Sequence, residues 1–412
     1  MSLDVDNART RAYNKDRIVT VSLAVICQSF QALTMGGIAL FLPLIRQDLS
    51  LSSTQGGSLA AATTIVYALM QIPAGYLSDR FGAKRIYWIG ILGTTIFAFT
   101  FGLVDNYWQA VVNQLLSGLF RSLVFAAGMS LLTSWFPPRR RATAMALWLV
   151  GGFLGNVTLD VVGPLLVARF DWRFPFLSFA AIGILSSLLL MRFGKEPPGT
   201  VKHQKLNILE SLQFFRSGLM WACGIVQFVR LAVMQGVSFW LPTFLIEERG
   251  LSLGSVGVLV AVQALLTAPS NLIGAAISDK IKNPPVVIEF SLAMLAITTA
   301  LFATVSSTFW AITLIFVNSI FIQMYFGPLF SIPVEILGQH RAGISTGFGN
   351  LFANVGGLVS VYILGILRDT THSLNSGFYL IAGVSTIGFI TAFWLARMRT
   401  KAIALTIYRN VG

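Results

Sequence analysis

Charged residues are scarce in this chain, and acidic residues are the scarcest of them. Asp and Glu number 16 against 29 Lys and Arg, and charged residues make up 11% of the 412 positions. Hydrophobic residues reach 55%, and the mean hydropathy is +0.75. A water-soluble domain of this length needs far more charge on its surface. The composition therefore excludes a soluble globular protein and predicts a chain embedded in lipid.

Cysteine and histidine are almost missing, with 2 and 3 residues respectively. Cys27 and Cys223 lie inside apolar segments, where lone cysteines are packing residues more often than disulfide partners. His203, His340 and His372 are scattered over connections, so the sequence contains no metal-ligand cluster. A glycine-rich phosphate loop and a nucleophile elbow are absent too. We therefore expect neither enzymatic activity nor a cofactor.

Long apolar runs are what the chain has in abundance. A helix needs about 20 apolar residues to cross the hydrocarbon core, and runs of this kind recur about a dozen times. They predict an all-α membrane protein with 12 transmembrane helices. The expected helices cover residues 18–45, 55–79, 85–103, 107–136, 142–168, 173–193, 214–246, 252–278, 285–306, 308–333, 342–367 and 376–398.

The net charge of +13 suggests a nucleic-acid partner until the positions of the charges are considered. Most of the 29 Lys and Arg residues fall in the two termini and in the even-numbered connections between the expected helices. This bias is the positive-inside rule for a multi-pass protein of the inner membrane with both termini in the cytoplasm. The partner that the basic residues indicate is the lipid bilayer, and nucleic acid is not expected.

The two halves of the chain are similar to each other. At an offset of 199 residues, identical or related residues align over the first two helices of each half: Gln28 with Gln227, Gln31 with Arg230, and Gly75 with Gly274. Such a parallel repeat predicts two pseudo-symmetric bundles with a substrate site between them. We expect a six-helix bundle over 1–193, a polar cytoplasmic linker over 194–213 and a second six-helix bundle over 214–412.

The connection after the second expected helix reads Gly75-Tyr-Leu-Ser-Asp-Arg-Phe-Gly-Ala-Lys-Arg85, with a degenerate copy at Gly274 to Lys280. This loop resembles the signature of the major facilitator superfamily. The resemblance implies alternating access in a secondary transporter, with a gating role for Asp79, Arg80, Gly82, Arg85 and Asp279. The plainer interpretation is a solvated turn between two helices. Trp135-Phe136-Pro137, Phe239 to Leu245 and Gly365 to Asp369 are similar to the anion:cation symporter branch, whose substrates are organic anions.

Two arginines lie near the centres of expected helices. Placing Arg121 or Arg230 in the middle of a membrane costs about 2.5 to 3.5 kcal/mol, so such residues usually face a cavity and serve function. The resemblance implies that their helices line the central cavity, one in each half. No acidic residue reaches the same depth, and a positive cavity favours a carboxylate or phosphate that accepts bidentate hydrogen bonds. The alternative is that each arginine snorkels or satisfies backbone carbonyls.

Other polar residues on the cavity helices are candidates for reading the neutral part of the substrate, or for stitching helices together in lipid. They are Gln28, Gln31, Gln227, Gln235, Tyr325, Asn350 and Asn354. The resemblance to the symporter branch implies an acidic residue two helical turns after Arg121, but Gly128, Met129 and Ser130 stand there. This argues against proton coupling and leaves anion exchange or uniport open. Asp160 and Glu335 are the fallback proton sites.

The function that these residues predict is alternating-access transport of a small organic anion by a monomer. The runner-up is a proton-driven exporter of drugs or metabolites, which would need an acidic residue deep in its cavity. A membrane sensor that kept the fold without turnover ranks third, because no soluble signalling domain is recognisable. Arg121 and Arg230 are expected to clamp one anionic group of the substrate together.

Overall fold

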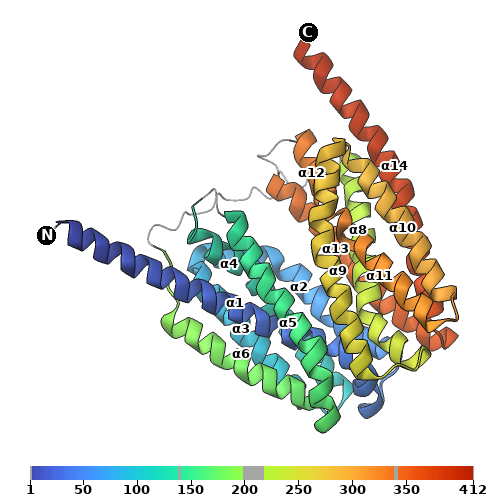
Figure 1. Ribbon diagram of the computed structural model, residues 1–412, viewed down its shortest axis with the longest axis horizontal. Coiled ribbons are helices and arrows are strands. Elements are labelled where there is room, and N and C mark those ends of the chain that lie inside the picture. Colours follow the sequence, from blue (N-terminus) through green and yellow to red (C-terminus); the bar gives the residue numbers. More distant parts are fainter. Residues whose placement is uncertain (1, 138–140, 198–217, 338–341, 412) are drawn as a thin grey trace. The chain divides into compact units, whose positions relative to one another are not determined.

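The computed structural model describes residues 2–137, 141–197, 218–337 and 342–411, and over these ranges it is helical and contains no strand (Figure 1). Within them, side chains are not described at positions 2–12, 33–35, 72, 79, 141–143, 145, 146, 268, 333–337, 342–347 and 401–411. The first helices are Ser2–Asp48 (α1), Ser53–Phe81 (α2), Ala83–Phe101 (α3), Tyr107–Ser134 (α4), Arg141–Arg169 (α5) and Arg173–Phe193 (α6). They are followed by Gly218–Thr243 (α8), a π-helical turn Phe244–Glu248 (η3), Leu253–Ile281 (α9), Pro284–Thr304 (α10), Thr308–Met324 (α11), Phe326–Leu337 (α12), Ala342–Thr371 (α13) and Asn375–Val411 (α14).

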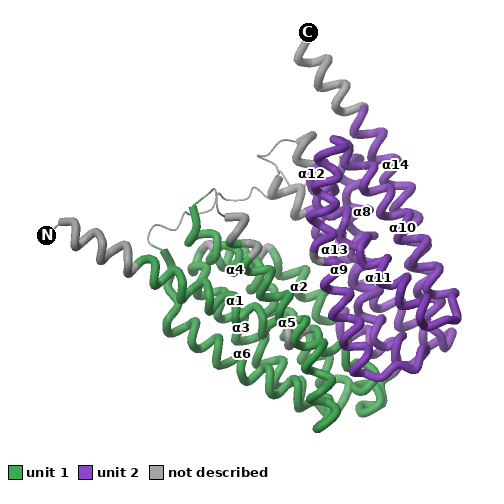
Figure 2. Tube along the Cα trace, in the orientation of Figure 1, with its two compact units in different colours: residues 1–51, 62–204 green, residues 52–61, 205–412 purple. Residues whose placement is uncertain are grey.

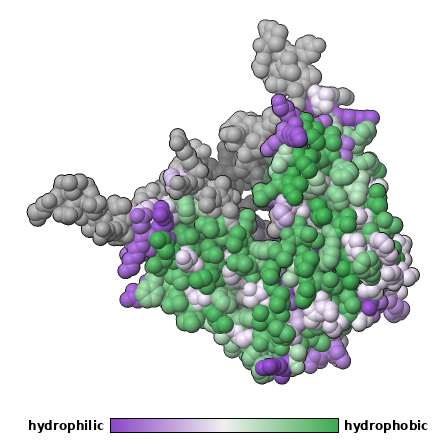
Figure 3. Space-filling view, viewed as in Figure 1, coloured by the Kyte–Doolittle hydropathy of each residue, from purple (hydrophilic) through white to green (hydrophobic). Residues whose placement is uncertain are grey.

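Ten helices of the described residues are long and apolar enough to cross a membrane, judged by length and composition; α2 and α3 are not among them. Large side chains such as Leu69, Leu272 and Phe309 stay exposed by 70% or more. Figure 3 shows that hydrophobic residues dominate the visible surface and that hydrophilic ones gather near helix ends. A surface of this kind is stable in lipid, where every backbone polar group must be satisfied within its own helix.

The chain packs as two compact units (Figure 2). Unit 1 comprises residues 1–51 and 62–204, and unit 2 comprises residues 52–61 and 205–412. The start of α2 therefore packs with unit 2, while the rest of the helix packs with unit 1. The expected linker begins at residue 194, but its part from 198 onward lies outside the described residues. The predicted bundle boundaries stay a prediction.

A carboxylate explains why the start of α2 belongs to unit 2. Asp369, near the end of α13, accepts hydrogen bonds from the backbone N–H groups of Ser53 (2.8 Å) and Thr54 (2.6 Å). These N–H groups have no acceptor within the helix, and a negative charge at a helix N-terminus is favourable. Gly57 packs so closely on α13 that a Cβ there would lie 2.8 Å from the Val361 carbonyl oxygen.

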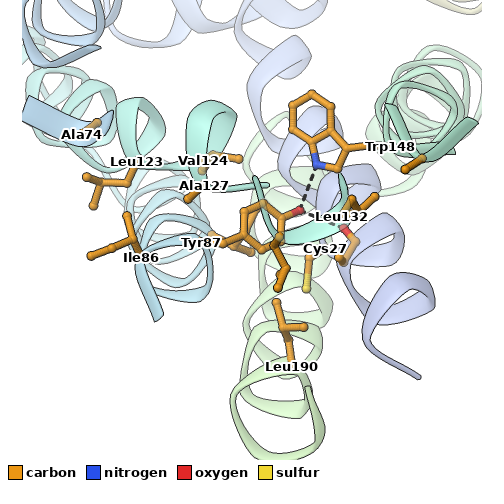
Figure 4. Packing of buried hydrophobic residues seen from close by; sticks show 14 residues of the cluster. Cys27, Ala74, Ile86, Tyr87, Leu123, Val124, Ala127, Leu132, Trp148 and Leu190 are labelled. Carbon is orange, nitrogen blue, oxygen red and sulfur yellow. Dashed lines mark hydrogen bonds between the residues drawn. The ribbon is translucent and has the colours of Figure 1, made fainter. Parts of the chain in front are cut away.

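The core of unit 1 is built around Tyr87, which is fully buried in α3 (Figure 4). Its hydroxyl donates to the Ala24 carbonyl (2.8 Å) and accepts from the Trp148 indole N–H (3.4 Å). Cys27 lies in the same cluster, and both cysteines are buried and free, as packing residues should be. Every polar atom of this tyrosine is thus satisfied by the protein itself.

Unit 2 differs from the sequence prediction at one point that matters for the site. The helix expected over 308–333 is interrupted at Tyr325, so that α11 ends at Met324 and α12 begins at Phe326. Two features act against a continuous helix. Pro328 has no N–H to donate in the first turn of α12. Gly274 of α9 brings its backbone against Met324, where a Cβ would lie 1.7 Å from the carbonyl oxygen.

We predict that Gly274→Ala destabilises the protein by about 1 to 3 kcal/mol, because the added methyl group overlaps backbone that cannot rotate away. Gly75→Ala is the matched control: it is the repeat partner of Gly274, and a Cβ there meets nothing within 4 Å. Thermal unfolding of the purified protein in detergent compares the two. If both variants melt at the wild-type temperature, the close approach of α9 to Met324 is wrong.

Candidate functional site

Arg230 lies on α8 in unit 2 and is almost completely buried, with 6% of its surface exposed. Its Nε donates a hydrogen bond of 2.8 Å to Oε1 of Gln227, one helical turn earlier. Its guanidinium carbon lies 4.7 Å from the centre of the Phe326 ring, at the start of α12. Residues three apart on a helix share a face, and this placed the glutamine correctly beside the arginine. The aromatic support from α12 was not predictable, because it comes from a distant segment.

Tyr325 is the second polar residue at this place. It is fully buried, and its hydroxyl has no hydrogen-bond partner among the described residues. The phenol and the Arg230 guanidinium are close enough to interact electrostatically. Arg230, Gln227, Tyr325 and Phe326 therefore form one cluster around the break between α11 and α12, called the Arg230 cluster below.

Arg121 lies on α4 in unit 1 and is half-buried. Its guanidinium carbon is 4.9 Å from the centre of the Tyr67 ring, which belongs to the part of α2 that packs with unit 1. An arginine above an aromatic face gains about 0.5 to 2 kcal/mol, more when water is excluded. Each arginine thus stands on an aromatic ring from another helix of its own unit.

Neither arginine pairs with an acid in the part of the chain that the structure describes. The ion pairs found there involve other arginines and lysines: Arg173 with Asp48, Lys195 with Asp16 and Arg368 with Glu247. A buried guanidinium without a counter-charge keeps its full capacity to bind an anion. Because Arg121 and Arg230 belong to different units, a shared role in clamping one group stays a prediction.

The remaining candidate binding residues lie on α1, α8 and α13. Gln28 and Gln31 on α1 are buried, and Oε1 of Gln28 has no hydrogen-bond partner among the described residues. Gln235 packs against Gly357 of α13. Asn350 is exposed, and its carbonyl accepts a hydrogen bond of 2.8 Å from Nδ2 of Asn354. That bond follows the turn of α13, so Asn354 serves its own helix in this structure.

The signature loop has a well-defined geometry around Gly82. This glycine precedes α3 with φ of 92°, a conformation that favours glycine. The Glu196 carboxylate accepts a 2.6 Å hydrogen bond from the backbone N–H of Lys84, and a Cβ on Gly82 would lie 2.9 Å from it. Sequence reasoning missed Glu196; its signal was an acid in a segment otherwise rich in basic residues.

The other predicted gating residues whose side chains the structure describes, Arg80, Arg85 and Asp279, are exposed. Arg80 donates a 3.1 Å hydrogen bond to the Tyr76 hydroxyl, and its guanidinium lies 5.3 Å from the Phe81 ring. The Asp79 side chain lies outside the described residues. The gating role of this loop stays a prediction.

The two predicted proton sites, Asp160 and Glu335, lie on α5 and α12. Asp160 on α5 is buried, with 6% of its surface exposed. Glu335 on α12 has a side chain outside the described residues. Over the described ranges, no group of three His, Cys, Asp or Glu residues could hold a metal ion. The recognisable chemistry of this chain is therefore positive charge and hydrogen-bond donors inside helical units.

Comparison with known families agrees with the repeat, the signature loop and the helical fold. The family model described as "Major Facilitator Superfamily" matches residues 24–361. The chain belongs to the Major Facilitator Superfamily. Members of this superfamily are transporters, so the protein is a multi-pass membrane transporter and not an enzyme. The likeness expected from Gly75 to Arg85 is confirmed.

Similar curated members of the superfamily carry organic anions according to their names. The chain is 23% identical to the "Hexuronate transporter" of Bacillus subtilis (strain 168), over 93% of this chain and 96% of that one. It is 24% identical to the "Probable sulfoacetate transporter SauU" of Cupriavidus necator, over 94% and 96%. The predicted resemblance to the organic-anion branch is confirmed.

Among solved structures, the chain is similar to a bacterial homolog of the human lysosomal transporter Spinster, in an inward-facing and unoccupied conformation. The TM-score is 0.81 at 17% sequence identity, over 94% of this chain and 98% of that one. At this identity the likeness shows the fold alone. It supports the major facilitator arrangement of the helices.

The hydrogen bond between Gln227 and Arg230 leads to a prediction about anion binding. Gln227→Glu places a carboxylate where Oε1 now accepts from Arg230, so the variant should form an internal ion pair and cancel the positive charge. We expect the affinity for organic anions to fall at least tenfold, with an unchanged or higher melting temperature without ligand. Anion-induced shifts of the melting temperature measure both quantities.

Gln227→Leu separates the lost charge from the lost hydrogen bond, since it removes the acceptor without adding a negative group. Its effect on anion affinity should be smaller than that of Gln227→Glu. Equal affinities of the wild type and a folded Gln227→Glu variant would show that Arg230 plays no part in anion binding.

Proposed function

We propose that the protein moves a small organic anion, bearing a carboxylate or phosphate group, across the inner membrane by alternating access. The observation that carries the proposal is the pair of arginines, Arg121 and Arg230, each set on an aromatic ring and without an acidic partner among the described side chains. Burying such charges is costly, and binding an anion offsets the cost. Gln28, Gln31 and Gln227 add amide groups suited to the rest of a polar substrate.

The names of relatives support the same class of substrate. A hexuronate and a sulfoacetate are both small and both carry an oxyanion that a guanidinium can hold in bidentate geometry. The runner-up, a proton-driven exporter of drugs or metabolites, needs a deep acid that attracts cations. Asp160, a buried carboxyl group in unit 1, favours the exporter. The positive charge of the two arginines argues against the exporter, because it would repel a cationic drug.

For the topology we propose 12 transmembrane helices in two six-helix halves, with both termini in the cytoplasm. The basic residues of the termini and even-numbered connections support this orientation. Counting α11 with α12 as one interrupted span, and adding α2 and α3 to the ten apolar helices, gives the proposed number. We propose that the protein acts as a monomer in the lipid bilayer. Its proposed binding partner is the small anion.

Counterflow in proteoliposomes tests the proposal. Liposomes loaded with unlabelled D-glucuronate, D-glucarate or sulfoacetate should accumulate the same radiolabelled anion from outside, and a loaded cationic drug should not drive any uptake. Counterflow needs no net driving force, so it works for a symporter, an exchanger or a uniporter. Uptake of the cationic drug with none of the anions would favour the exporter.

Conservative arginine variants should show partial loss in the same assay. Arg121→Lys and Arg230→Lys keep the positive charge but lose the planar fork, so each should weaken anion affinity by roughly tenfold. Arg121→Gln and Arg230→Gln also remove the charge and should weaken anion affinity by up to about a hundredfold. Arg80→Lys, at an exposed position in the last turn of α2, is the control that keeps affinity. If the Arg121 and Arg230 variants transport with wild-type affinity, the arginines are structural.

A further inference from the structure

Tyr325 is a polar residue whose burial the protein does not compensate. Its hydroxyl is fully buried and lacks a hydrogen-bond partner among the described residues. Buried hydroxyl groups are normally satisfied, because losing water without gaining a partner is unfavourable. Tyr87, the fully buried tyrosine of unit 1, follows that rule with two partners. The unpaired hydroxyl of Tyr325, at a break between two helices, suggests that a ligand supplies the missing hydrogen-bond acceptor.

The position of Tyr325 tells which kind of acceptor is missing. It separates α11 from α12, so the first N–H groups of the 12-residue helix α12 begin directly after it. The start of a helix is electropositive and its N–H groups lack partners within the helix. The next residue, Phe326, supports the guanidinium of Arg230 at 4.7 Å. Donors and positive charge thus converge where the hydroxyl is unpaired.

Gln227 fixes which edge of the guanidinium remains available. It binds Nε at 2.8 Å, which leaves the two Nη atoms for a ligand. A carboxylate can accept from both Nη atoms and still has lone pairs for a further donor. The amide oxygen of the Arg230 cluster, Oε1 of Gln227, already accepts from Nε. A group made of acceptors, an oxyanion, therefore complements this cluster.

We propose that Tyr325 is a substrate-binding residue, whose hydroxyl donates to the same carboxylate or related oxyanion that Arg230 binds through its two Nη atoms. The inference rests on the proposed function and deepens it, because it adds a second donor, from unit 2, to the anionic group that Arg230 binds. It also changes the role expected for Tyr325 from the sequence, which was to read the neutral part. The break in the helix then serves to carry this hydroxyl into the site.

Tyr325→Phe tests the inference cleanly, since it removes an oxygen atom that has no hydrogen-bond partner among the described residues. The ligand-free variant should melt at or above the wild-type temperature. Its affinity for D-glucuronate, D-glucarate and sulfoacetate, measured by titrated melting shifts, should fall about tenfold to a hundredfold. Replacement of Tyr325 by 3-fluorotyrosine keeps the ring and strengthens the donor, so it should bind at least as tightly as the wild type.

Tyr87→Phe is the matched control with the opposite expectation. It breaks the hydrogen bond to Ala24, so it should lower the melting temperature of the ligand-free protein and leave anion affinity unchanged. Wild-type affinity in Tyr325→Phe, together with weakened binding in Arg230→Lys, would overturn the inference and leave the proposed function standing. If none of the three anions binds the wild type, both fall.

Discussion

The cost of a guanidinium group in an apolar interior is the constraint on which this structure depends. A soluble protein would answer it with a carboxylate, and such pairs do occur here near helix ends, as between Arg368 and Glu247. Inside the units the protein uses aromatic faces and an amide instead: Tyr67 under Arg121, and Phe326 with Gln227 around Arg230. These neutral partners stabilise the charge without cancelling it. In our proposal this positive charge is available to an anionic substrate.

The lipid environment explains why so much of the remaining architecture is regular and why its irregular points deserve a functional interpretation. In hydrocarbon every backbone polar group has to be satisfied within a helix, so breaks are tolerated where they are buried in protein or line a cavity. The described chain departs from α-helix inside spanning segments at the π-helical turn Phe244–Glu248 and at Tyr325. The second of these lies beside Arg230, where the break places a hydroxyl and a helix start next to the charge.

The sequence predicted what depends on local spacing and composition. Helix ranges such as 107–136 and 173–193 agree with α4 and α6, and the three-residue spacing places Gln227 one turn before Arg230 on the same helical face. The segment from Gly75 to Arg85 resembles the signature loop of the superfamily, and this resemblance predicted the family correctly. These features need no knowledge of which helices touch.

The sequence could not predict what depends on contacts between distant segments. The Tyr67 and Phe326 rings, the carboxylate of Glu196 against the loop after α2, and the carboxylate of Asp369 on the start of α2 all join residues far apart in the chain. At the interruption at Tyr325, Pro328 is the signal that the sequence did carry, because it has no N–H to donate to the Met324 carbonyl four residues earlier; the close approach of Gly274 in α9 to the same carbonyl is the part that the sequence could not show. A periodic apolar pattern looks the same with or without such a neighbour, so it predicted one continuous helix.

We propose that the positive charge of Arg121 and Arg230, rather than shape alone, selects the substrate. The most direct measurement compares counterflow of D-glucuronate with that of D-glucuronamide, which has nearly the same size and hydroxyl groups but no charge. The account predicts saturable uptake of the acid anion and at least a tenfold lower affinity for the amide. Equal affinities for the two compounds would contradict it.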